Sequence, residues 1–125
     1  MSSQPRDYLA SMEECVLGLM EGTSGPLNAE QKILVQIVHD NMCHVPGLLE
    51  LLQNFPASEL SAETAMALLQ DLHSLLWPIR SYTELIGGGV AGPLTPTQVQ
   101  ATRLILKQVQ NIEVWANSFC ATTSV

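Results

Sequence analysis

Apolar residues recur at alternating spacings of three and four along most of this chain, which is the pattern of helices that bury one stripe. The longest run lies between residues 62 and 86, and it consists of Ala65, Leu68, Leu72, Leu75, Ile79, Tyr82 and Ile86. Shorter runs predict three more helices, from Pro5 to about Gly22, from Asn28 to about Phe55 and from about Pro96 to Cys120. Such stripes must cover one another, so the pattern predicts an all-α protein.

Each of the other three helices has its own expected buried stripe. The first stripe is Tyr8, Met12, Cys15 and Leu19, and the second is Leu34, Val38, Val45, Leu48 and Leu52, widened by Ile37 and Leu49. The last stripe is Thr102, Ile105, Val109, Ile112, Ala116 and Phe119. Asn41 lies on the second stripe, where a buried Asn typically fixes helix register. Pro46 with Gly47 should kink the second helix, and Pro78 should bend the third, because proline removes a backbone donor.

Glycine-rich turns with explicit capping signals separate the helices within each half of the chain. Glycines 87–89 end the third helix, and Thr95 with Gln98 has the spacing of a capping box that starts the fourth. Asn28 with Gln31 has the same spacing at the start of the second helix. Between the halves, Ser58 or Ser61 is the expected N-cap of the third helix.

The two turns repeat at an offset of 67 residues. Gly-Pro-Leu at 25–27 matches Gly-Pro-Leu at 92–94, since 92 − 25 = 67, and the two capping boxes match at the same offset. The apolar stripes of the first and third helices also coincide. We interpret the chain as two tandem copies of one helical hairpin, residues 5–55 and 62–120, which close a four-helix bundle within a single domain, 1–125.

The composition restricts the kind of partner. A content of 46% hydrophobic residues among 125 is enough for one core, and 12 acidic against 5 basic residues give a formal net charge of −7. Lys and Arg do not cluster, which argues against nucleic acid or an anionic membrane as the partner. The N-terminus lacks the features of a signal peptide and no stretch is apolar for long enough to span a bilayer, so we expect a cytoplasmic protein.

Metal and cofactor chemistry is not indicated by the sequence. Cys15, Cys43 and Cys120 are odd in number and lack metal-ligand spacing, so we expect ordinary reduced residues. His39 and His44 are five residues apart, whereas helical metal pairs prefer three or four. We therefore expect no metal site and no cofactor.

The stretch from Gln70 to Gln98 resembles the dimerisation and histidine-phosphoacceptor domain of two-component sensor kinases. That family has a box of the form H-[ED]-L-R-[ST]-P-L, then a phrase like I-x-G-Y-[ST]-E-L-L and a glycine-rich turn. The corresponding segments are QDLHSLL at 70–76, IRSYTELI at 79–86 and GGGVAGPLTPTQ at 87–98. Two family chains each give a hairpin to one bundle, so the resemblance implies that this chain is a tandem pseudo-dimer.

The phosphoacceptor box departs from the family pattern. Gln70 replaces the acceptor histidine in the ungapped register, and an amide cannot attack a phosphoryl group as an imidazole does. A second register makes His73 the acceptor, because His73 precedes Pro78 by the family's own spacing, and it requires three deleted residues before Tyr82. The family's ATP-binding N-box and lid are absent, so the resemblance implies no autophosphorylation by this chain alone.

The resemblance therefore implies a non-catalytic signalling module that binds a protein partner, such as a response-regulator receiver or a sensor kinase. Receivers dock near the box, so the expected partner-binding residues are Gln70, His73, Trp77 and Arg80. Trp77 and Trp115 could each anchor a partner, although a tryptophan beside an apolar stripe more often packs against the core. Two alternatives are a histidine phosphotransferase that uses His73 and a purely structural bundle in a larger assembly. The chain is expected to be a monomer or a homodimer.

Overall fold

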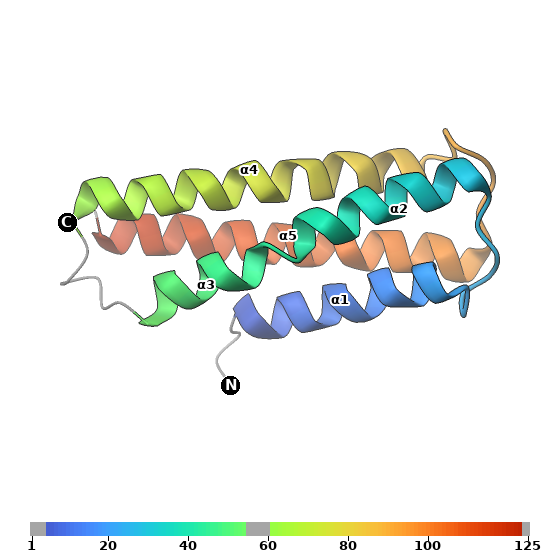
Figure 1. Cartoon of the computed structure of the whole chain (residues 1–125). Helices are drawn as coiled ribbons and strands as arrows, with labels where there is room; N and C mark the ends of the chain where they lie inside the picture. Colours follow the sequence, from blue (N-terminus) through green and yellow to red (C-terminus); the bar gives the residue numbers. More distant parts are fainter. Residues whose placement is uncertain (1–4, 55–60, 124–125) are drawn as a thin grey trace.

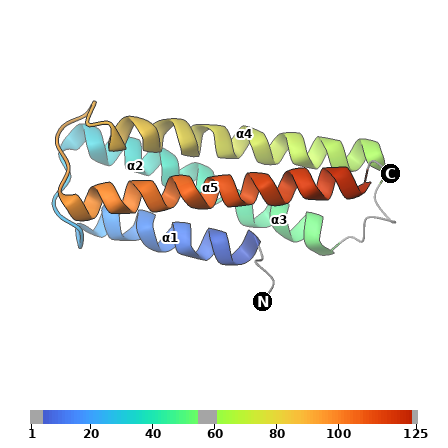
Figure 2. The same ribbon diagram turned by 180° about the vertical axis from the view of Figure 1, so that it is seen from behind.

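The computed structural model describes residues 5–54 and 61–123, and these form helices joined by short turns (Figure 1). The helices are α1 (Pro5–Glu21), α2 (Ala29–Met42), α3 (Val45–Asn54), α4 (Ala62–Gly87) and α5 (Pro96–Thr123). They pack side by side as a bundle, with α5 against α1 and α4, and α2 against α1 and α4 (Figure 2). α3 continues from α2 and packs on α4 and α1. The prediction of an all-α bundle is confirmed.

Each helix contributes one row of buried residues to the core, and within a row the residues alternate at spacings of three and four. On α1 and α2–α3 they are Leu9, Met12, Val16, Leu19, Gln31, Val35, Val38, Met42, Val45, Leu49 and Leu52. On α4 and α5 they are Ala65, Leu69, Leu72, Leu76, Ile79, Thr83, Ile86, Gln98, Thr102, Ile105, Val109, Ile112 and Ala116. This seven-residue period is typical of helices that pack at shallow crossing angles.

The stripes predicted for α1, α2–α3 and α4 are partly wrong, because several of their residues lie beside the buried row and not on it. Tyr8, Cys15, Leu34, Leu48, Leu68, Leu75 and Tyr82 flank the core as half-buried residues, and the buried residues that complete the rows are their neighbours Leu9, Val16, Val35, Leu49, Leu69, Leu76 and Thr83. The α5 stripe is confirmed from Thr102 to Ala116, and the side chain of Phe119 lies outside the described residues. Asn41 is only half-buried and its Nδ2 donates to Ile37 O of its own helix, so its predicted role between helices is wrong.

The predicted kink near Pro46 is a complete break. α2 ends at Met42 and α3 begins at Val45, because Pro46 has no N–H to donate to the preceding turn. Cys43 N donates to His39 O at 3.0 Å, and this bond closes the last turn of α2. Pro78, by contrast, lies within α4, which continues without a break from Ala62 to Gly87. Pro78 therefore does not interrupt α4, and the predicted bend at this residue stays a prediction.

Both predicted capping boxes are present, and the two turns have the same backbone. Asn28 and Gln31 exchange hydrogen bonds of 2.8 and 2.9 Å, while Thr95 and Gln98 exchange bonds of 3.1 and 2.9 Å. Four glycines have positive φ angles that match at the offset of 67: Gly22 (78°) with Gly89 (79°), and Gly25 (130°) with Gly92 (135°). Ser61 caps α4 as predicted, whereas Ser58 lies outside the described residues.

The two turns lie at the same end of the bundle and hydrogen-bond to each other (Figure 1). The buried amides of Gln31 and Gln98 donate to backbone carbonyls of the opposite turn, so these polar groups are satisfied within the core. The bonds are Gln31 Nε2 to Gly92 O and Pro93 O at 3.2 Å each, Gln98 Nε2 to Pro26 O at 3.1 Å, Asn28 Nδ2 to Ala91 O at 2.7 Å and Thr95 Oγ1 to Ser24 O at 2.8 Å. At the offset of 67, four of these five bonds form two reciprocal pairs, Gln31 to Pro93 with Gln98 to Pro26 and Asn28 to Ala91 with Thr95 to Ser24.

Candidate functional site

The four residues expected to bind a partner lie on one outer face of α4. Gln70, His73, Trp77 and Arg80 follow one another at spacings of three, four and three, which places them on adjacent turns of the helix. Gln70, His73 and Trp77 are exposed and Arg80 is half-buried. This face is separate from the buried row of α4.

A shallow groove of about 580 Å³ runs between α4 and α5 beside this face. His73, Arg80 and Glu84 line its α4 side, and its α5 side consists of Leu106, Gln110, Glu113, Val114 and Asn117. The guanidinium of Arg80 forms an ion pair with the carboxylate of Glu113 across the groove. The groove therefore combines a histidine, a bridging ion pair and one more carboxylate with two apolar side chains.

The two tryptophans have different environments. Trp115 on α5 is half-buried and packs against the core, as expected for a tryptophan beside an apolar stripe. The side chain of Trp77 is 67% exposed, so the packing role expected for it is wrong. Sequence could not separate the two, because the rotation of α4 about its axis depends on its neighbours.

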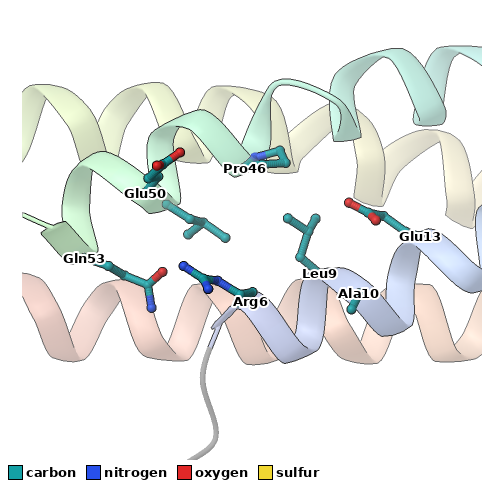
Figure 3. Close-up of a pocket in the computed structure, with 8 residues that line it drawn as sticks. Arg6, Leu9, Ala10, Glu13, Pro46, Glu50 and Gln53 are labelled. Carbon is teal, nitrogen blue, oxygen red and sulfur yellow. The ribbon is translucent and has the colours of Figure 1, made fainter.

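A second groove, of about 340 Å³, lies between α1 and α3 (Figure 3). Arg6 points across it towards α3, and Leu9 points towards Pro46 (Figure 3). At the offset of 67, Arg6 corresponds to His73 and Glu13 to Arg80. The second groove thus occupies the place in the first half that the α4/α5 groove occupies in the second. This groove was not predicted from the sequence, although the offset of 67 leads from His73 and Arg80 to Arg6 and Glu13.

The two described cysteine side chains differ in exposure, since Cys15 is half-buried and Cys43 is exposed. Burial raises the pKa of the Cys15 thiol, and the Glu14 carboxylate raises this pKa further, so Cys15 is a protonated thiol at neutral pH. Cys43 is exposed at the end of α2, and its Sγ lies 3.7 Å from Nε2 of His39. His44, which the sequence analysis compared with His39, is exposed one residue further on.

Comparisons with protein-family models, with curated proteins and with solved structures found no match. Within residues 5–54 and 61–123, no three or more His, Cys, Asp or Glu side chains converge in a way that could hold a metal ion. None of the helices in this part of the chain has an apolar run long enough to cross a bilayer. The case for a function consequently rests on the residues of the site.

Proposed function

We propose that this chain is a non-catalytic signalling interaction module that has the shape of a paired histidine-phosphoacceptor domain. In this interpretation α1 with α2–α3 forms one hairpin, α4 with α5 forms the other, and the two make a four-helix bundle equivalent to a family dimer. The chain binds a protein partner, a response-regulator receiver or a sensor kinase, through the α4/α5 groove. It acts as a monomer or as a homodimer.

The reciprocal hydrogen bonds between the turns support the pseudo-dimer. Two identical hairpins related by a two-fold axis contact each other with the same residues in both directions. Gln31 donates to Pro93 O and Gln98 donates to Pro26 O, and both residues of one pair differ from those of the other by 67 (98 − 31 and 93 − 26). The matching φ angles of the four turn glycines support the same interpretation.

The observation that carries the proposal is the exposure of Trp77 on the outer face of α4. Trp77 does not itself line the groove, but it lies on α4 between His73 and Arg80, which do. A tryptophan that is 67% exposed leaves a large apolar surface in water. Arg80 lies one helical turn further along the same face, and Val114 on the α5 wall is 58% exposed. Tryptophan and arginine are the residues most often found as anchors of protein interfaces, so this face has the composition of a docking site.

The acceptor position supports a non-catalytic role, and His73 supports the second candidate function. Gln70 is exposed at the position of the family's acceptor, where its amide has no nucleophilic nitrogen. His73 is also exposed and lines the groove, so a phosphorylated partner that docks there would meet an imidazole. A histidine phosphotransferase that uses His73 is therefore the alternative, and a purely structural bundle is the third hypothesis.

The test is retention of receiver domains from the same source on the immobilised chain. We expect Trp77→Ala to weaken retention at least tenfold, since anchor tryptophans contribute about 2 kcal/mol or more. Ile33→Ala is the matched control, because Ile33 is 61% exposed on α2, outside the groove. Equal loss in both variants would contradict docking at the α4/α5 groove. Circular dichroism of both variants verifies that the fold is kept.

The same mixture separates the three hypotheses when the receivers are phosphorylated. Intact mass should show no acid-labile phosphate on the chain if it is a docking module. A phosphate that disappears in His73→Gln would establish the phosphotransferase instead. Absence of any binding to a receiver or a kinase would favour the structural hypothesis. That hypothesis also predicts that substitutions at Gln70, His73 or Arg80 leave binding within a larger assembly unchanged. Leu72→Ala or Ile79→Ala should instead unfold the protein, because each leaves a cavity in the core.

A further inference from the structure

An acidic stripe follows the outer face of α1. Asp7, Ala10, Glu14, Leu17 and Glu21 are all exposed, and their spacings of three and four place them on one side of the helix. Among the described residues, none of the three carboxylates of this stripe forms an ion pair. The outer face of α1 therefore presents negative charge to solvent together with the exposed side chain of Leu17.

The neighbouring helix α5 has the opposite charge on its outer face. Arg103 and Lys107 are exposed one helical turn apart, and α5 contains no acidic residue before Glu113. With Leu104 they line a shallow depression of about 440 Å³ whose other lining residues are uncharged. Neither basic side chain forms an ion pair among the described residues. A chain with a net charge of −7 thus keeps two unpaired cations on one helix face.

Two hydrogen bonds fix how α1 and α5 are aligned along the bundle. Gln108 Nε2 donates to Ser11 Oγ at 3.3 Å, and Thr95 Oγ1 donates to Ser24 O at 2.8 Å. Both pairs of residue numbers sum to 119 (11 + 108 and 24 + 95), as expected for neighbouring segments that run in opposite directions. The two helices lie side by side, α1 running towards the turns and α5 away from them (Figure 2).

This alignment places opposite charges at the same level of the bundle. Glu14 is level with position 105 (14 + 105 = 119), midway between Arg103 and Lys107 and about 3 Å along the bundle axis from each. Leu17 is level with position 102, about 3 Å along the axis from Leu104. These five residues define the α1/α5 face. Its charges are exposed side by side without neutralising each other within the chain.

We infer that the α1/α5 face binds the same face of a second copy of this chain. A two-fold axis parallel to the bundle keeps each level and exchanges the two helices, so α1 of each copy lies against α5 of the other. Glu14 of each copy then lies between Arg103 and Lys107 of the other, beside the depression on α5. A two-fold axis across the bundle would instead place α1 on α1 and acid against acid. Charge complementarity therefore selects the parallel arrangement.

The opposite face of the bundle lacks this complementarity. At the offset of 67, Lys107 corresponds to Asp40 and Glu14 corresponds to Ser81. The helical repeat therefore supplies no second surface of this kind, and association should end at a closed dimer. The inference goes beyond the proposed docking function and does not rest on it, because no residue of the α1/α5 face lines the α4/α5 groove.

Charge reversal tests the inference, with the dissociation constant of the dimer measured by analytical ultracentrifugation. Glu14→Lys with Glu21→Lys, and separately Arg103→Glu with Lys107→Glu, should each raise this constant about a hundredfold, because like charges then face each other. An equimolar mixture of the two variants should dimerise like the original chain, since each contact again joins opposite charges. A chain with all four changes should also dimerise, and it keeps the original net charge.

A matched control separates the α1/α5 face from net charge. Glu50→Lys with Asp71→Lys makes the same change of net charge at exposed positions outside this face, and it should leave the dissociation constant nearly unchanged. Added salt should weaken the original dimer. A chain that is monomeric at every concentration, a dimer that survives both reversals, or reversed chains that keep their helical circular dichroism yet do not associate when mixed would overturn the inference.

Discussion

The groove between α4 and α5 and the groove between α1 and α3 occupy equivalent places in the repeat, yet among the described residues an ion pair crosses only the first. Arg80 meets Glu113 in the α4/α5 groove. Their equivalents at the offset of 67 are Glu13 and Pro46, so the carboxylate of Glu13 has no charged counterpart there. The same Pro46 breaks the helix in the first half, whereas α5 is continuous.

The buried parts of the two halves differ much less than their grooves. Buried positions coincide along the repeat, as with Met12 and Ile79 or Leu19 and Ile86. The turn glycines also coincide, and so do Gln31 and Gln98, the capping residues that donate hydrogen bonds to the opposite turn. Packing and turn geometry thus constrain both halves in the same way, whereas the groove residues differ between them. Functional differences between the halves should therefore lie in the grooves and on the outer helix faces.

The largest effect is expected where a turn glycine loses its conformational freedom. Gly92→Ala places a Cβ 2.6 Å from Asn28 Nδ2 in a backbone with φ of +135°, so we expect a loss of about 3 kcal/mol in the free energy of unfolding. Urea denaturation measures it. Gly47→Ala is the control, because a Cβ there meets no atom within 4 Å and alanine favours the helix. Similar losses in both variants would contradict the turn argument.

The side-chain amides of Gln31 and Gln98 should contribute equally to the free energy of unfolding if the two turns are equivalent. Gln31→Ala and Gln98→Ala each remove donors to carbonyls of the opposite turn, together with one half of a capping box. We expect each variant to lose about 2 kcal/mol in urea denaturation, with exposed Gln100→Ala nearly unchanged. A difference above about 1 kcal/mol between the two would show that one turn depends on the other more than the reverse.

One pair of equivalent buried positions has a polar residue in the second half and an apolar residue in the first. Each residue can therefore be replaced by the one at the equivalent position. Thr83 corresponds to Val16, and its Oγ1 is buried without a hydrogen-bond partner among the described residues. Thr83→Val should raise the free energy of unfolding by about 1 kcal/mol, and Val16→Thr should lower it by about 1 to 2 kcal/mol. Thermal unfolding of both variants decides the matter. Destabilisation by Thr83→Val would mean that the hydroxyl has a stabilising role.

The smallest effect concerns the ion pair that distinguishes the grooves. The side chains of Arg80 and Glu113 are both partly exposed, so solvent screens their attraction. Arg80→Gln should change the free energy of unfolding by only about 0.5 kcal/mol, and a double-mutant cycle with Glu113→Gln should give a coupling that vanishes in concentrated salt. A coupling that persists in salt would contradict a partly exposed pair.

Sequence could predict the helices, the turns and the capping boxes because glycine, proline and capping side chains act on their own neighbourhood. It could not determine which of two adjacent apolar rows faces inward. Leu75 and Leu76 are equally apolar, and Tyr82 is more apolar than Thr83, yet Leu76 and Thr83 are the buried members. The rotation of a helix in a bundle depends on the three helices around it.

The same limit applies to the candidate site. That Gln70 and His73 are exposed could be predicted, since both lie off every apolar row. The ion pair of Arg80 with Glu113 could not, because it depends on how α4 and α5 are aligned along their axes. The exposure of Trp77 depends on helix rotation in the same way. The exposure of residues that lie off the apolar rows was thus predictable, whereas contacts between side chains of two different helices were not.

The crossed hydrogen bonds between the turns have a consequence for the order in which the chain folds. Their donors and acceptors are 61 to 72 residues apart in sequence. Bringing such distant segments together carries a larger loss of chain entropy than closing a hairpin, and long-range contacts slow folding. The helices of each hairpin can meet first, while the end of the bundle that holds both turns closes late. Neither turn completes its hydrogen bonds alone, so the two halves should unfold in one cooperative transition.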